Sequence, residues 1–131
     1  MKEVNQSILH DPDNGKNGDC WRASIASVLE LPIEDVPHFA DMNIREGRMS
    51  ELKLLAKHGF TAYTIYGEKS MNDHPKMLPD DNEYYFAIGP SPRNKDINHQ
   101  VVCHKGKIVH DPHPDKTGLA GISYFEILLK L

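Results

Sequence analysis

The chain lacks most of the features that mark specialised classes of protein. It has only two cysteines, and its 15 basic and 19 acidic side chains leave a net charge of −4. Two cysteines are too few for a disulfide-stabilised scaffold, and they favour a reducing, cytoplasmic location. A mildly acidic chain is a poor ligand for nucleic acids or anionic membranes, so we expect neither as a partner.

Long apolar runs are also missing. No segment approaches the ~18–20 apolar residues that a transmembrane helix needs, and residues 1–15 lack the apolar stretch of a secretory signal. Hydrophobic residues make up 39% of the chain and charged residues 26%, which is typical of a folded domain. Domains cluster at about 100–150 residues, so we expect residues 1–131 to form a single domain.

The order of predicted elements is helices first and strands afterwards. A helix is predicted over Cys20–Glu30, with Asp19 as N-cap and Pro32 beyond its end, and a second over Ser50–His58. Strands are predicted from β-branched and aromatic runs, with long loops at 67–83 and 89–97; the strand ranges are 60–66, 84–88, 98–103, 107–111 and 122–129. Helices followed by mostly antiparallel strands predict an α+β domain.

Cys20 is the first candidate for chemistry. It follows a glycine-rich turn and begins the first predicted helix. The dipole and free N–H groups of a helix N-terminus favour the thiolate, which is the nucleophilic form of cysteine. Taken alone, a cysteine is more often a small buried residue, so Cys20 needs partners before it indicates catalysis.

A predicted hairpin supplies two such partners. His99 begins an apolar strand, and a histidine beside a cysteine is the usual general base of thiol catalysis. If residues 104–106 form a three-residue loop with Gly106 in a bulge, then Cys103 faces Lys107 and His99 faces Asp111. Opposed residues share a face, so Asp111 would orient the imidazole, whereas a two-residue loop would put the two on opposite faces.

At these residues the chain resembles the papain-like cysteine peptidase superfamily. The sequence NGKNGDCW at 14–21 is similar to the papain pattern Gln-Gly-x-Cys-Gly-Ser-Cys-Trp, and Asn98-His99-x-Val is similar to the family's histidine strand. The Asn-Ser-Trp motif of papain is absent. An aspartate in Asp111-Pro112 after a His-x-Val-Val strand is closer to the bacteriocin leader peptidases of ABC exporters and their compact bacterial and phage relatives.

The resemblance implies a role for each matching residue. Cys20 would be the nucleophile, His99 the base and Asp111 the orienting group, with no cofactor or metal. Family members place a glutamine six residues before the cysteine to donate to the oxyanion. That position is Asn14 here, one methylene shorter, and Asn17 is the alternative. The implied fold is a nucleophile-bearing helix packed on a small antiparallel sheet.

The function predicted from these residues is a cysteine peptidase or amidase that cleaves an amide or isopeptide bond of a peptide or protein through a thioester. Acyl transfer and deamidation would use the same triad, because the triad does not encode the acceptor. A non-catalytic binding module or inhibitor on the same fold is a second alternative. A metal-binding protein is a third, since zinc accepts the side-chain types that gather near the end of the hairpin: Cys103, His104, His110, Asp111 and His113.

Overall fold

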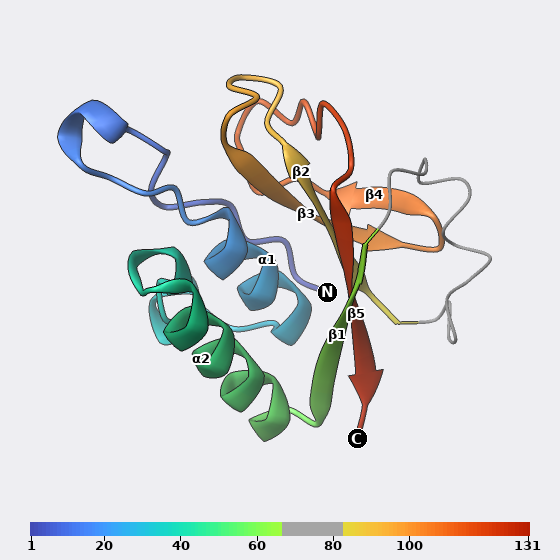
Figure 1. The fold of residues 1–131 in the computed structure, drawn as a ribbon. Coiled ribbons are helices and arrows are strands. Elements are labelled where there is room, and N and C mark those ends of the chain that lie inside the picture. Colours follow the sequence, from blue (N-terminus) through green and yellow to red (C-terminus); the bar gives the residue numbers. More distant parts are fainter. Residues whose placement is uncertain (67–82) are drawn as a thin grey trace.

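Two helices pack on one face of a five-stranded sheet in the computed structural model, which describes residues 1–66 and 83–131 (Figure 1). The elements are α1 (Cys20–Leu29), α2 (Ile44–Lys57), β1 (Phe60–Tyr66), β2 (Tyr85–Pro90), β3 (Asn98–His104), β4 (Lys107–His110) and β5 (Tyr124–Lys130). The strand order is β1-β5-β2-β3-β4, and each neighbouring pair is antiparallel. The predicted α+β class is confirmed. Apart from residue 83, the loop predicted at 67–83 lies outside the described residues.

The sheet has an apolar cluster on each face. Ile25 of α1 and Leu55 of α2 meet Phe86 and Val102 on the helix-covered face. Tyr85, Val101, Cys103 and Phe125 form a second cluster, and the alternation of side chains along β2 and β3 puts it on the other face. None of the helices in the described part of the chain has the length and apolar character needed to cross a bilayer.

Helix α1 begins where the sequence predicts, but Asp19 does not cap it. The Asp19 carboxylate is fully buried and makes no hydrogen bond to the helix. It instead accepts hydrogen bonds from the Ser7 N–H (3.0 Å), the Ser7 hydroxyl (2.6 Å) and the Ile8 N–H (2.9 Å). These bonds fasten the N-terminal segment across the start of α1.

Helix α2 begins six residues before the predicted start at Ser50. Asn43 is the N-cap, and its side chain accepts a hydrogen bond from the Glu46 N–H at 2.9 Å. An N-cap bond of this kind stabilises a helix by about 1 kcal/mol. Position 47, inside this helix, is a glycine because the Phe39 backbone passes close to it. A Cβ at this position would lie 2.7 Å from the Phe39 carbonyl oxygen.

The hairpin of β3 and β4 turns differently from the prediction. His104 pairs with Lys107 and Cys103 with Ile108, so the loop has two residues, and the predicted register is wrong. Lys105 and Gly106 both have positive φ, as in the type I′ turn that matches the twist of paired strands. The register then shifts by one residue, because Val102 pairs with His110.

This bulge restores the facing that a two-residue loop alone would lose. One extra residue on β4 offsets the one-residue change in the loop, so side chains beyond the bulge return to the face predicted for them. Counted on from Val102 and His110, Asp111 lies opposite Val101, on the same side of β3 as His99. The relation predicted between His99 and Asp111 is therefore reached by a different backbone route.

Candidate active site

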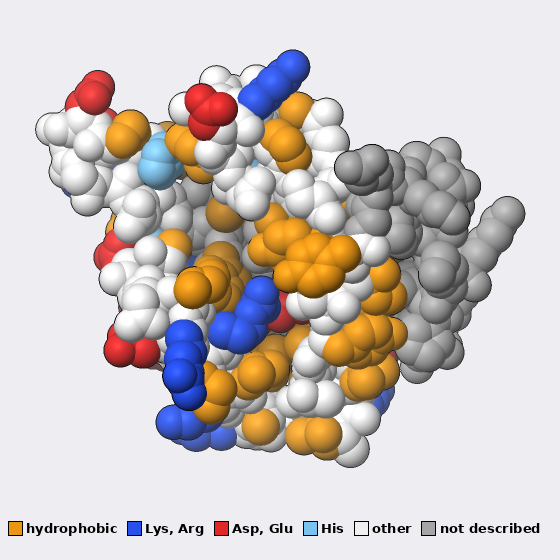
Figure 2. Space-filling model, in the orientation of Figure 1, with side chains coloured by type: hydrophobic (Ala, Val, Ile, Leu, Met, Phe, Trp, Pro, Cys, Tyr) orange, Lys and Arg blue, Asp and Glu red, His pale blue; other side chains and the backbone are white. Residues whose placement is uncertain are grey.

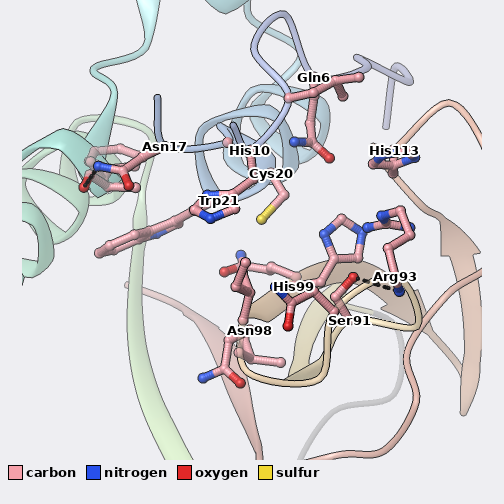
Figure 3. A pocket seen from close by; sticks show the side chains of 18 of the residues that line it. Gln6, His10, Asn17, Cys20, Trp21, Ser91, Arg93, Asn98, His99 and His113 are labelled. Atoms are coloured by element: carbon pink, nitrogen blue, oxygen red, sulfur yellow. Dashed lines mark hydrogen bonds between the residues drawn. The ribbon is translucent and has the colours of Figure 1, made fainter. Parts of the chain in front are cut away.

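Cys20 is the first residue of α1 and is half-buried. Its side chain points into a cavity, toward the imidazole of His99, which begins the long strand β3 (Figure 3). The helix and the strand are both tied into the core, so the thiol and the imidazole are held by rigid elements rather than by loops. The first N–H groups of α1 have no partner within the helix, as at every helix start.

Asp111 lies behind His99 and is hydrogen-bonded to it. The His99 Nε2 to Asp111 Oδ1 distance is 2.7 Å, and both side chains are buried, with exposed fractions of 4% and 5%. Asp111 also accepts the N–H of His113 at 2.9 Å and that of Gly118 at 2.7 Å. Because Nε2 is used by Asp111, Nδ1 is the ring nitrogen left for the Cys20 side.

These contacts change the acid–base properties of both groups. Burial alone would lower the pKa of His99, but its bonds with Asp111 and Cys20 and the charges of those groups raise the pKa to about 9. Burial also works against ionisation of Asp111, yet the hydrogen bonds from His99, His113 and Gly118 hold its pKa below the usual value. His99 is therefore protonated and Asp111 ionised at neutral pH, which is the arrangement that stabilises a nearby thiolate.

The cavity at Cys20 has a volume of about 740 Å³ and extends to both sides of the sulfur. Trp21 and Asn17 lie on one side, and His113 and Arg93 on the other (Figure 3). The molecular face in Figure 2 is hollowed, and hydrophobic side chains gather around the hollow. Residues of the lining thus lie on both sides of the Cys20 sulfur.

The structure does not bring Asn14 to this cavity. It belongs to a short 3₁₀ turn, and its amide donates to Asp11 Oδ2 at 2.6 Å in an exposed position. Asn17 does line the cavity, but its Nδ2 donates to the Ala40 carbonyl (3.3 Å) and to Asp41 Oδ1 (3.2 Å). Asn14 thus lies outside the cavity, and both hydrogens of the Asn17 amide are used away from Cys20.

Gln6 is the residue that the sequence reasoning missed. Its amide lies beside the Cys20 side chain (Figure 3), with Nε2 donating to the Ile8 carbonyl at 3.1 Å. A Cβ at Gly18 would lie 3.2 Å from Gln6 Nε2, so the glycine leaves room for this side chain. No local sequence pattern points to Gln6. It reaches the cavity because Asp19 accepts hydrogen bonds from the N–H groups of Ser7 and Ile8, the two residues that follow it.

A buried charged cluster supports the wall of the cavity next to Trp21. The Trp21 indole N–H donates to Glu51 Oε2 at 2.5 Å, and Arg48 Nη1 bonds to Glu51 (2.7 Å) and to Glu126 (2.5 Å). Burial and the neighbouring Glu51 carboxylate raise the pKa of Glu126 well above its usual value. One cation is thus shared by two carboxyl groups, and the raised pKa of Glu126 favours its protonated form.

The metal-binding alternative gains no support from the geometry. Within residues 1–66 and 83–131, no group of three or more His, Cys, Asp or Glu side chains is arranged to hold a metal ion. The histidines near the hairpin are used elsewhere: His110 Nε2 lies 2.8 Å from the Val4 carbonyl, and the His104 ring packs against Tyr84. Cys103 is fully buried in the apolar cluster on the far face of the sheet.

The chain shows a likeness to a solved structure, but not to a protein family or a curated protein. No protein-family model matches the chain, and neither does any curated protein. Among solved structures, the chain is similar to a double glycine motif protease from an AMS/PCAT transporter, determined in complex with the leader peptide. The match covers 99% of this chain and 95% of the other, with 18% identity and a TM-score of 0.46.

Proposed function

We propose that residues 1–131 form a papain-like cysteine peptidase or amidase domain in which Cys20, His99 and Asp111 are the catalytic triad. The observation that carries the proposal is the buried 2.7 Å bond between His99 Nε2 and Asp111 Oδ1. The opposite edge of the imidazole, which carries Nδ1, is turned to the Cys20 thiol. Three residues from two distant parts of the sequence meet in the order nucleophile, base and orienting group. A thiol nucleophile must stay reduced, which the cytoplasm provides.

In the proposed reaction the Cys20 thiolate attacks the carbonyl carbon of a peptide or protein amide. The His99 imidazolium then donates its Nδ1 proton to the leaving amine as the C–N bond breaks, which leaves a thioester on Cys20. Neutral His99 next takes a proton from water, the hydroxide attacks the thioester, and the carboxylic acid leaves as the thiol is restored. Acyl transfer or deamidation would differ only in the amine or water that enters or leaves.

Gln6 replaces Asn14 in this proposal as the side-chain donor to the oxyanion. A primary amide nitrogen has two hydrogens, and only one is used by the Ile8 carbonyl. The second is available to a negatively charged oxygen on the carbon that Cys20 attacks, together with the Cys20 N–H at the start of α1. Asn14 does not line the cavity, so it lacks the position for this role.

The proposal is tested by limiting alkylation, which needs no known substrate. We expect limiting iodoacetamide near pH 6 to label Cys20 before Cys103, because imidazolium stabilises the Cys20 thiolate whereas burial raises the pKa of Cys103. His99→Ala should slow the labelling of Cys20, and Asp111→Asn should slow it less. A Cys20 that reacts no faster than a free cysteine peptide at the same pH would contradict the proposal and favour a non-catalytic binding module.

A further inference from the structure

One buried amide in the cavity has no use in the fold or in the proposed reaction. Gln100 lines the cavity, and only 6% of its surface is exposed. Its Nε2 has no hydrogen-bond partner among the described residues. Leaving a buried donor unpaired costs free energy, so an amide kept in this state calls for an external acceptor.

The position of Gln100 places this donor next to the reacting groups. It follows His99 directly on β3, and it pairs across the sheet with Ile88, which in turn pairs with Tyr124. All of these residues line the same cavity as Cys20. Gln100, Ile88 and Tyr124 thus form one row across three strands, and the side of the row facing the helices borders the cavity.

Besides this row of sheet residues, the cavity has apolar lining residues from the helical part of the chain. It is lined by Phe39, Met42 and Ile44, with Trp21 nearer to Cys20. Trp21 packs against Phe39 with the ring centroids 5.1 Å apart. A side chain that enters here therefore meets apolar surface along its length and, on the residue that follows His99 in β3, an amide nitrogen without a partner among the described residues.

We propose that Gln100 determines specificity by selecting a substrate side chain that carries a carbonyl or carboxylate oxygen on an apolar stem, as glutamine and glutamate do. The inference rests on the proposed peptidase function and deepens it, since it names the chemistry of one substrate residue. A purely apolar side chain of the same size would fill the space but leave the Gln100 donor unpaired.

The two candidate substrate side chains differ in charge: glutamate offers a carboxylate oxygen and glutamine a neutral carbonyl oxygen. Arg48 also lines this part of the cavity, and its guanidinium is shared by Glu51 and Glu126. Burial and Glu51 raise the pKa of Glu126, which favours the neutral form of that carboxyl group. A carboxylate and an amide both satisfy the Gln100 donor, and comparing them measures how much of the Arg48 charge reaches the cavity.

The test uses peptide vinyl sulfones, in which the Cys20 sulfur adds to the vinyl carbon β to the sulfonyl group, the carbon α to that group takes up the proton, and no group leaves. The probes are acetyl-X-Gly and acetyl-X-Ala-Gly vinyl sulfones with X as glutamine, glutamate or norleucine, plus methyl vinyl sulfone as a peptide-free reference. The second-order rate of Cys20 alkylation is followed by mass spectrometry. In one of the two series we expect glutamine or glutamate to react at least about tenfold faster than norleucine, the upper part of the discrimination expected for one hydrogen bond.

Gln100→Leu should abolish that preference by accelerating the norleucine probe and slowing the other two. Its melting temperature should be unchanged or higher, because an apolar side chain of similar volume replaces an unpaired buried amide. Asn5→Leu is the control: Asn5 carries the same amide group, but it is exposed and does not line the cavity, so its replacement should leave the ratio of the rates unchanged.

The possible failures are distinguishable. If wild-type Cys20 shows no advantage for glutamine or glutamate in either series, or if Gln100→Leu keeps the advantage, the specificity inference is overturned while the peptidase proposal stands. If Cys20 reacts with methyl vinyl sulfone no faster than a free cysteine peptide, the proposed function fails and the specificity inference fails with it.

Discussion

Cys20 and Cys103 carry the same side chain, but their surroundings differ. Cys20 begins a helix, is half-buried and points toward His99 in an open cavity. Cys103 lies on β3, four residues after His99, fully buried among Val101, Phe125 and other apolar side chains. Burial there raises the pKa of the Cys103 thiol, which keeps it neutral.

The comparison teaches that reactivity is assigned by neighbours rather than by residue type. Cys103 is close to His99 along the chain and its side chain lies on the same side of β3, yet it is surrounded by apolar groups that cannot stabilise a negative charge. Cys20 is 79 positions before His99 and meets it in space. The variants below test whether the two thiols differ as much in function as they do in surroundings.

The largest difference is expected when each thiol is removed. Cys20→Ala should lower any amide hydrolysis by at least about 10⁴-fold, because no other group of the site can form the thioester. Cys103→Ala should keep the activity and lose about 1 kcal/mol of folding free energy through a small cavity in the core. Rates on a peptide substrate and urea unfolding curves measure the two effects. Turnover retained by Cys20→Ala would remove the distinction between the thiols.

The next largest effect is expected when His99, the histidine beside Cys20, is replaced. His99→Ala should lower hydrolysis by about 10²–10⁴-fold, because the proton donor and the partner of the thiolate are both lost. His110→Ala is the matched control: His110 is equally buried, but it bonds to the Val4 carbonyl. That variant should lose about 1 kcal/mol of stability and keep most of its activity. An inactive His110→Ala with an active His99→Ala would reverse the assignment.

A smaller effect is expected at the oxyanion donor. Gln6→Ala should lower kcat by about 10²–10³-fold, as the loss of one preorganised donor does, while the rate of iodoacetamide labelling at Cys20 stays near the wild-type value. Labelling forms no oxyanion, so it separates loss of the donor from loss of the thiolate. Asn14→Ala is the control, and it should be active because its amide serves Asp11 outside the cavity. The opposite pattern would return the role to Asn14.

The smallest effect is a dependence of stability on pH. The pKa of His99 is raised to about 9 in the folded protein, above the ordinary value of about 6.5, so the folded state holds this proton more tightly than the unfolded state does. The resulting stabilisation is fully present below about pH 6.5 and is lost as the pH rises through about 9. It amounts to roughly 3 kcal/mol from the two pKa values.

Urea unfolding of the wild type and of Asp111→Asn at pH 6 and pH 9.5 measures this contribution. The variant should show the smaller decrease, because one of the groups that raise the pKa of His99 has been neutralised. Equal decreases in the two proteins would mean that the bond between His99 and Asp111 does not hold the proton.

The sequence by itself determined the residues with local signatures. The glycine-rich turn and the following helix identify Cys20, and the apolar strand that follows His99 identifies the histidine, because helix starts and strands depend on a few consecutive residues. The α+β class follows from the same local patterns. The start of α2 differs from the prediction because Asn43 and Ser50 are both acceptable N-caps, and in the folded chain it is Asn43 that accepts the capping hydrogen bond.

Only the tertiary structure decided how the site is completed. The hairpin reaches the predicted facing of His99 and Asp111 through a two-residue turn and a bulge, which no single-residue pattern reveals because both depend on how the strands twist against their neighbours. Gln6 enters the site because the buried Asp19 carboxylate binds the residues after it, a use of Asp19 that competes with helix capping. Gln6 and Cys20, 14 positions apart in the sequence, meet in the cavity because the buried Asp19 carboxylate requires hydrogen bonds from the N-terminal segment.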